Sequence, residues 1–306
     1  MYTVDQKIIE VLKTKSFTVS AEIIPPRNGE AQRDVFEKIS KLIGAQVDFL
    51  SVTKGAGGSL RGGSLPIAQA IKDHFSCPSI AHFTCRDLVP EEIENSLMDH
   101  HYFGIRNILA LRGDPPMGVE SWVSREGGYS FAYQLVDQIR ALNEGEFLSR
   151  ANFKVDRKEK TDFCIGVAVY PEHPDEQERI LFSQEKFRRG ADYGITQMLF
   201  DPDVYARYLD LLATQGIYKP ILPGLRILKS KKQAQVMKQR FGCATPEWYF
   251  QNLPDDDKPL NGPSVLEPFL KIVENLKRVG APGVHLFILS DTDLNIEAIT
   301  QLNSWR

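Results

Sequence analysis

The stretch GITQMLFDPDVYARYLDLL, residues 194–212, contains one complete strand-and-helix unit. Residues Gly194–Phe200 are apolar apart from one threonine and one glutamine, as expected of a strand that is covered on both faces. Asp201 and Pro202 follow as an N-cap and a first-turn proline. The apolar residues beyond them recur at helical spacing. This order of elements is typical of a parallel β/α fold.

The same alternation recurs along the chain. The sequence predicts eight strands, at Phe17–Ile24, Phe49–Thr53, Ser79–Thr84, Asn107–Leu111, Cys164–Tyr170, Gly194–Phe200, Ile221–Leu225 and Gly283–Leu289. Helices are expected between them, with Ala31–Ile43 stopped by Gly44 and Pro263–Val279 stopped by Gly280. Strands and helices in this order favour a (β/α)8 TIM barrel, with an open doubly wound sheet as the alternative.

No internal repeat or interdomain linker interrupts this order. We therefore expect residues 1–306 to form a single (β/α)8 barrel catalytic domain, with an N-terminal helical extension ahead of the first strand. The charged and poorly periodic stretch Asn143–Thr161 is interpreted as a surface excursion.

The composition excludes several classes of partner. Lys and Arg number 37 against 40 Asp and Glu, so no overall field favours nucleic acid or an anionic membrane. No apolar run reaches membrane-spanning length, and the first residues carry no signal-peptide pattern. The four cysteines are scattered, without metal or disulfide spacing. We therefore expect a cytoplasmic protein with reduced thiols, no nucleic acid, no membrane and no metal site.

Polar side chains fall where the predicted strands end, which is where a parallel barrel carries its active site. Separate strands contribute these groups, which are Glu22, Thr53, His82, Thr84, Arg112, Gly113, Asp114, Tyr170 and Gln197. Because chance supplies only one or two such positions, the whole set favours an active site over isolated surface groups.

Glu22 is the candidate with the most specific chemistry. It lies in the apolar strand end SAEIIPP, where a carboxylate loses hydration and its pKa should rise. A carboxyl group in such a place holds a proton near neutral pH and can act as a general acid. The alternative is a structural glutamate paired with an arginine in the barrel mouth, which we consider less favoured because buried carboxylates are rare.

Three other segments leave alternatives open. Arg112–Asp114 forms a turn that lets the backbone approach a ligand, or else contains an internal Arg–Asp ion pair. Residues Gly55–Gly63 are glycine-rich without a known phosphate-loop pattern, which favours a flexible loop over a lid or phosphate site. The basic stretch Lys229–Arg240 favours a solvated helix face, with the steering of an anionic substrate tail as the alternative.

Several motifs occur together in a fixed order. They are AEIIPPR (residues 21–27), SVTKGAGGSLR (51–61), AHFTC (81–85), ILALRGDPP (108–116), VYPEHP (169–174) and ITQMLFD (195–201). With these motifs the chain resembles the methylenetetrahydrofolate reductase family over nearly its whole length, from about Phe17 to Leu289. The family fold is a (β/α)8 barrel, in agreement with the strand pattern.

The resemblance implies roles for individual residues. Glu22 matches the family's general acid, and Asp114 matches a group that contacts the pterin and influences the flavin. Gln197 and Met237 match positions on the substrate face. The positions that match FAD contacts are Thr53, His82, Arg112, Gly113, Asp114, Phe131, Ala132, Ala168, Tyr170, His173 and Lys186.

The sequence departs from the family pattern toward the outer ends of both ligands. The segment Tyr170–His173 is one residue shorter than usual, and Arg179 stands where an acidic flavin contact is common. Met237 replaces an aromatic residue, and Asp291 replaces an arginine. These changes leave open how the protein holds the far end of FAD and the folate tail.

The resemblance implies a flavin-dependent oxidoreductase of one-carbon metabolism and methionine biosynthesis. NAD(P)H would reduce FAD, and the flavin would then reduce 5,10-methylenetetrahydrofolate to 5-methyltetrahydrofolate in a ping-pong reaction. Two alternatives remain at this point: a flavin-free reductase that uses NAD(P)H directly, and a folate-binding subunit that needs a partner for electron delivery. The choice between NADH and NADPH stays open, and a homo-oligomer is possible.

Overall fold

Eight parallel strands form a closed barrel in which each strand lies beside its neighbours in the sequence. The computed structural model describes residues 3–55, 62–115, 122–148, 159–255, 262–288 and 292–305. The strands are β1 (Thr18–Ile23), β2 (Phe49–Val52), β3 (Ser79–Thr84), β4 (Asn107–Leu111), β5 (Cys164–Val169), β6 (Tyr193–Met198), β7 (Ile221–Leu225) and β8 (Gly283–Phe287). Because β1 pairs with both β2 and β8, the predicted barrel is confirmed and the open sheet is excluded.

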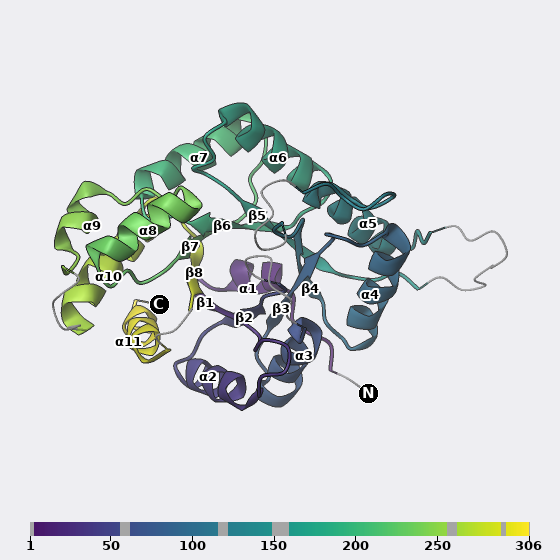
Figure 1. Cartoon of the computed structure of the whole chain (residues 1–306), viewed down its shortest axis with the longest axis horizontal. Coiled ribbons are helices and arrows are strands. Elements are labelled where there is room, and N and C mark those ends of the chain that lie inside the picture. The colour runs from purple at the N-terminus through teal and green to yellow at the C-terminus, as the bar shows by residue number, and fades with distance from the viewer. Residues whose placement is uncertain are drawn as a thin grey trace.

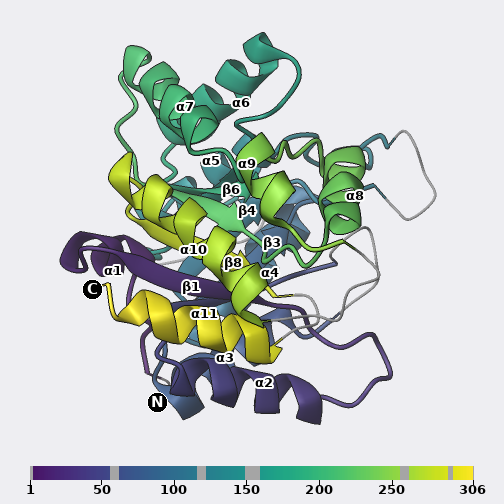
Figure 2. The ribbon, with the colours of Figure 1, turned by 90° about the vertical axis from the view of Figure 1, so that its left-hand side faces the viewer.

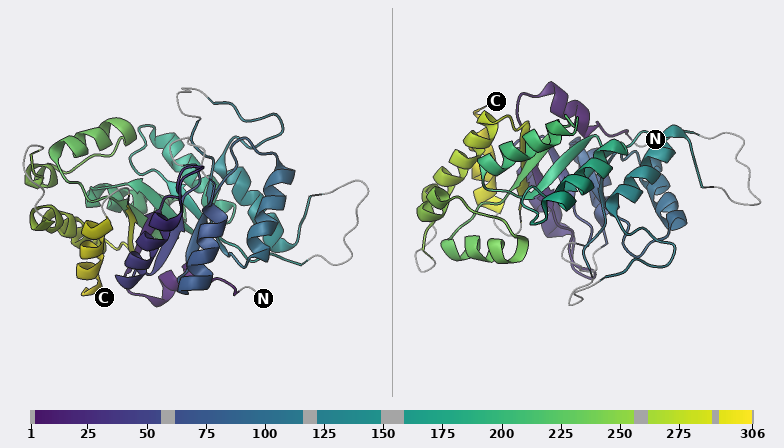
Figure 3. Two further views of the ribbon diagram at one scale, coloured as in Figure 1. Left: turned by 60° about the horizontal axis from the view of Figure 1, so that its bottom comes forward. Right: turned by 90° about the horizontal axis from the view of Figure 1, so that it is seen from above.

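Helices alternate with the strands and cover the outside of the barrel (Figure 1). They are α1 (Ile8–Thr14), α2 (Arg33–Gly44), α3 (Ser64–Phe75), α4 (Pro90–Tyr102), α5 (Ala132–Glu144), α6 (Glu176–Arg188), α7 (Pro202–Thr214), α8 (Lys231–Phe241), α9 (Glu247–Asn252), α10 (Gly262–Arg278) and α11 (Thr292–Asn303). Figure 2 shows α10 and α11 side by side next to β8 and β1. In Figure 3, the light-green and yellow helices α8 to α11 gather on one side of the barrel.

Three of the predicted helix signals are confirmed. The Asp201 carboxylate accepts a hydrogen bond from the Asp203 backbone N–H at 2.9 Å, as an N-cap does. Gly280 ends α10 with a left-handed φ of +93°. Helix α2 ends at Gly44 as expected, and the chain reverses two residues later at Gln46 with φ +63°.

Helix α1 closes the N-terminal end of the barrel. Its residues Ile8, Val11 and Leu12 pack with the inward side chains of the strands, including Phe49 and Tyr193. The predicted N-terminal helical extension is therefore confirmed as part of the barrel interior. With this end filled by apolar side chains, the opposite, C-terminal ends of the strands are left for a ligand.

Asn107, the first residue of β4, ties α1 to the barrel. Its Oδ1 accepts from the Ile8 backbone N–H at 2.8 Å. Its Nδ2 donates to Asp5 Oδ2 at 3.1 Å and to the Ser79 carbonyl at 3.1 Å. All of Asn107's side-chain capacity is used locally, so its role is structural.

The structure also bears on the cysteines, on membrane-spanning helices, on metal sites and on the predicted surface excursion. The four cysteines are buried and free of disulfides. In the described part of the chain, no helix is long and apolar enough to cross a membrane. No group of His, Cys, Asp and Glu there has the arrangement of a metal site. Of the predicted excursion Asn143–Thr161, residues 149–158 lie outside the described residues.

Candidate active site

Glu22 lies near the C-terminal end of β1, where its side chain is 12% exposed. Its Oε2 is 3.8 Å from Nε2 of His82 on β3, which is beyond hydrogen-bond distance. Burial raises the pKa of Glu22 to about 8. Burial, and secondarily the neighbouring His285, lowers the pKa of His82 to about 3. At neutral pH the glutamate therefore holds a proton beside a neutral imidazole.

The structural alternative for Glu22 required an arginine partner. Within the described ranges, the only basic side chain within 4 Å of its carboxyl is His82. A neutral histidine does not favour the carboxylate as an arginine would, so the loss of hydration is uncompensated. In the described part of the chain, Glu22 therefore has no arginine partner, and the structural alternative is not supported.

His285 forms a polar layer one step below Glu22 inside the barrel. The Ser20 hydroxyl donates to the Val284 carbonyl at 3.1 Å, so its oxygen accepts from His285 Nδ1–H at 2.8 Å. The Ser51 hydroxyl then donates to Nε2 at 3.1 Å. Burial lowers the pKa of His285 to about 3, which keeps the ring neutral and both nitrogens engaged. His285 therefore gives the site a fixed, uncharged floor.

Two cations meet on the opposite side of the mouth, after β4 and β5. Lys186 of α6 is 7% exposed and donates to the Ala168 carbonyl at 2.8 Å. Its Nζ lies 5.5 Å from the centre of the Tyr170 ring. Burial, together with the charge of Arg112, lowers the pKa of Lys186 to about 8. Lys186 and Arg112 thus form a positive region at the strand ends.

The Arg112–Asp114 turn brings its backbone close to β3. Gly113 has φ +96°, and a Cβ there would lie 2.9 Å from the Arg86 Cβ, so a larger residue would not fit. Arg86 donates to the Asp114 carbonyl. The Asp114 charge also acts on the Tyr170 phenol. The structure therefore brings Arg112, Asp114 and Tyr170 together, as the strand-end pattern predicts, and adds Lys186 of α6, which the family resemblance implies.

The remaining predicted cofactor positions lie around the same side of the mouth. Phe131 caps α5, is 37% exposed and stacks against Phe182 of α6 with ring centres 5.7 Å apart. Ala132 follows as the first residue of α5. His173 lies in the loop after β5, where its Nδ1 is 3.0 Å from the Asp175 carbonyl oxygen. Arg179 folds back onto this loop and donates to the His173 carbonyl at 2.6 Å.

These residues fit a dinucleotide flavin. Thr53 Oγ1 and His82 Nε2 are buried without a hydrogen-bond partner in the described part of the chain, and a ligand's polar atoms would satisfy both. The repulsion between Lys186 and Arg112 would be relieved by a phosphate group.

Gln197 reaches the site through an irregularity that the sequence does not reveal. Between β6 and β7 the pairing changes from Ile195 with Leu222 to Met198 with Gly224, so one strand carries an extra residue. Such bulges re-aim side chains beside active sites. The Gln197 Oε1 accepts from the Met198 backbone N–H at 2.9 Å, which leaves its amide NH2 to donate elsewhere.

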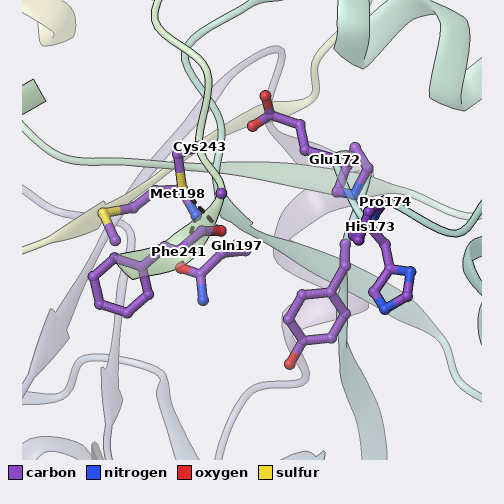
Figure 4. Close-up of a pocket in the computed structure, with 10 residues that line it drawn as sticks. Glu172, His173, Pro174, Gln197, Met198, Phe241 and Cys243 are labelled. Carbon is purple, nitrogen blue, oxygen red and sulfur yellow. Dashed lines mark hydrogen bonds between the residues drawn. The ribbon is translucent and has the colours of Figure 1, made fainter. Parts of the chain in front are cut away.

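A pocket beside Gln197 contains functional candidates that the sequence analysis missed. Its lining residues are Tyr170, Pro171, Glu172, His173, Pro174, Gln197, Met198, Phe241, Gly242 and Cys243. Figure 4 shows Phe241 and Gln197 on one side of this pocket and His173 on the other. In the sequence, Glu172 is one residue of the motif VYPEHP, and Phe241 lies at the end of a basic helix. Neither residue has a local pattern that indicates a functional role.

Met237, the predicted substrate contact on α8, is 4% exposed and packs in the core. Its sulfur lies 3.6 Å from Nη1 of Arg226. The structure thus leaves little of Met237 for a ligand to touch. Asp291 and residues 56–61 of the glycine-rich loop lie outside the described residues.

A buried carboxyl group, two cations and an amide at the C-terminal mouth of a (β/α)8 barrel are the arrangement expected of an enzyme active site. A family model described as methylenetetrahydrofolate reductase matches residues 7–303. The chain therefore belongs to the methylenetetrahydrofolate reductase family, a family of oxidoreductases.

Individual relatives agree with this assignment. The 5,10-methylenetetrahydrofolate reductase of Escherichia coli (strain K12) is 31% identical over 286 residues, which cover 90% of this chain and 88% of that protein. Methylenetetrahydrofolate reductase (NADH) 1 of Zea mays is 31% identical over 240 residues. This match covers 74% of the chain but only 38% of the longer maize protein.

A solved structure supports the fold. A protein from Clostridium thermocellum, described as binding two copies of 5-methyl-5,6,7,8-tetrahydrofolic acid, superimposes with a TM-score of 0.60. The superposition covers 98% of this chain and 100% of that chain, at 16% sequence identity. At this identity the likeness concerns the fold alone.

Proposed function

We propose that the protein reduces 5,10-methylenetetrahydrofolate to 5-methyltetrahydrofolate, with NAD(P)H as the electron source and FAD as the carrier. The observation that carries the proposal is the buried Glu22 carboxyl, 12% exposed and 3.8 Å from His82, at the barrel mouth of a member of this family. Opening the five-membered ring of the substrate requires a proton on the departing amine. Glu22 is placed to hold that proton at neutral pH, where an ordinary glutamate would have lost it.

The protein's own groups orient the two ligands around Glu22. Asp114 and the amide NH2 of Gln197 would hydrogen-bond the pterin. The neutral imidazoles of His82 and His285 would keep water and charge away from the Glu22 carboxyl. This orientation holds the substrate amine against the Glu22 carboxyl, which supplies the proximity that the proton transfer requires.

FAD would supply hydride transfer from the nicotinamide to the folate. The two substrates would bind at the same place, one after the other. The residues proposed to hold it are Thr53, His82, Arg112, Gly113, Asp114, Phe131, Ala132, Ala168, Tyr170, His173 and Lys186. Support comes from the unsatisfied atoms of Thr53 and His82 and from the paired cations.

An absorption spectrum of the purified protein, followed by thermal unfolding with and without added FAD, tests the cofactor. A yellow protein, or a melting temperature that rises with FAD, supports the proposal, because a ligand that binds only the native state must stabilise it. A colourless protein whose melting temperature FAD leaves unchanged would instead favour the flavin-free reductase. Turnover of NAD(P)H by the isolated chain separates both enzymes from a folate-binding subunit.

We also propose a cytoplasmic location and no nucleic-acid or membrane partner. Support comes from the buried, unpaired cysteines and the near-neutral net charge of −3. The relatives include a protein whose name specifies NADH, but the donor of this chain stays open between NADH and NADPH.

A further inference from the structure

We propose that Phe241 is the aromatic wall on which a flat ring of the folate substrate stacks, and that Glu172 is the positioning residue that holds Phe241 there. This inference rests on the proposed function and adds two residues to it. Phe241 ends α8, is 46% exposed and lines the same pocket as Gln197. It lies one helical turn after Met237, whose side chain is buried in the core.

The position of Phe241 is fixed from its C-terminal side. Gly242 ends α8 with a left-handed φ of +70° and donates its backbone N–H to the Lys238 carbonyl at 3.0 Å. Cys243 then enters the core, where it is 1% exposed. The next residue, Ala244, donates its backbone N–H to Glu172 Oε1 at 2.8 Å. The reversal after α8 is therefore fastened to the loop after β5.

Glu172 is suited to this task because it lies half-buried where the loop after β5 meets α6 and the start of α7. Its Oε2 is enclosed without a hydrogen-bond partner in the part of the chain that the structure describes. Arg179 of α6 and Asp201 at the start of α7 both act on its charge, with opposite signs. Burial raises the pKa of Glu172 to about 7, so at pH 6 the group is mostly neutral and the contact with Ala244 is a bond to an uncharged carboxyl.

The chemistry of the pocket selects a neutral ring over a phosphate-bearing one. None of its ten lining residues is a lysine or an arginine. Its walls include Met198, Pro171 and Phe241, and the Gln197 amide is available to donate. A flat conjugated ring with an acceptor atom can pack against the apolar walls and accept a hydrogen bond from the Gln197 amide. The phosphates of a nicotinamide cofactor would find no cation among these residues.

Calorimetric titration with 5-methyltetrahydrofolate at pH 6 tests the assignment on the FAD-loaded protein. Phe241→Leu should weaken binding by about fivefold to tenfold, the usual loss of a stacked ring, while Phe241→Trp should retain it. Tyr218→Leu is the matched control, because Tyr218 is 80% exposed and precedes β7 at the opposite end of the barrel. It should bind as the wild type does.

A double-mutant cycle separates positioning from general support. Glu172→Ala should weaken folate binding as much as Phe241→Leu does, whereas Glu172→Gln should bind folate as the wild type does. The double variant Glu172→Ala/Phe241→Leu should bind folate no worse than Phe241→Leu alone. Full binding by Phe241→Leu, or additive losses in the double variant, would overturn the proposal. A loss seen only in flavin reduction by NAD(P)H would also overturn it. Absence of folate binding by the wild-type protein would instead refute the proposed function itself.

Discussion

Replacement of Glu22 by glutamine separates the two halves of the proposed reaction. Glu22→Gln keeps the shape and hydrogen-bonding capacity of the side chain and removes its titratable proton. The pKa of Glu22 rises from 4.5 to about 8, which corresponds to about 5 kcal/mol in favour of the neutral form. At pH 7 the wild-type side chain is therefore mostly protonated.

The Glu22→Gln substitution should lower the rate of the folate half-reaction and not that of the nicotinamide half-reaction. Ring opening of methylenetetrahydrofolate consumes the proton, so this step should slow by about 10²-fold or more in Glu22→Gln. Reduction of FAD by NAD(P)H requires no proton from Glu22 and should stay within several-fold of the wild-type rate. In the wild type, the folate step should also fall as the pH rises through about 8, and the variant should lack this dependence.

Stopped-flow absorbance of the flavin follows each half-reaction separately. Asp175→Asn is a suitable control, since Asp175 caps α6 at the surface and its loss should leave both rates near normal. Equal losses in both halves of Glu22→Gln would mean that Glu22 organises the flavin pocket. Unchanged rates in both halves would place the proton donor elsewhere and refute the reasoning from burial.

Three other substitutions test separate parts of the structure. Asp114→Asn should weaken folate use and raise the flavin reduction potential in a spectroscopic redox titration, because a nearby carboxylate opposes the electron-rich reduced flavin; an unchanged potential and KM would make Asp114 structural. Lys186→Met should weaken FAD binding at least tenfold by fluorescence titration, since a phosphate of FAD would lose its buried cationic partner, and equal affinity would remove Lys186 from the cofactor site. Asn107→Ala should lower the free energy of unfolding in urea by about 2–4 kcal/mol because it frees α1 and leaves Asp5 short of a donor, whereas a loss below about 0.5 kcal/mol would contradict the account of α1.

The strands and the burial of Glu22 were predictable because their signals are local. A strand covered on both faces is apolar whatever lies next to it, so all eight could be recognised from short runs. Glu22 stood out for the same reason, as a lone carboxylate in an apolar strand end. The end of α2 at Gly44 was also predictable from a local signal, because glycine is a poor helix former.

The rest of the site depends on contacts that are distant in sequence. Glu172 meets Ala244 across 72 positions, and no local pattern indicates which backbone group a loop glutamate will accept from. The bulge that turns Gln197 exists only in the pairing of β6 with β7. The burial of Met237 and the exposure of Phe241 follow from how α8 lies against the barrel, although both are apolar residues of one helix.

The central claim is that flavin held by this barrel passes a hydride to methylenetetrahydrofolate. The most direct measurement is a single turnover without oxygen, in which protein with pre-reduced FAD is mixed with methylenetetrahydrofolate and both flavin absorbance and folate products are followed. The account predicts that the flavin reoxidises and that one 5-methyltetrahydrofolate forms for each FAD. Flavin that stays reduced in the presence of bound methylenetetrahydrofolate would contradict it.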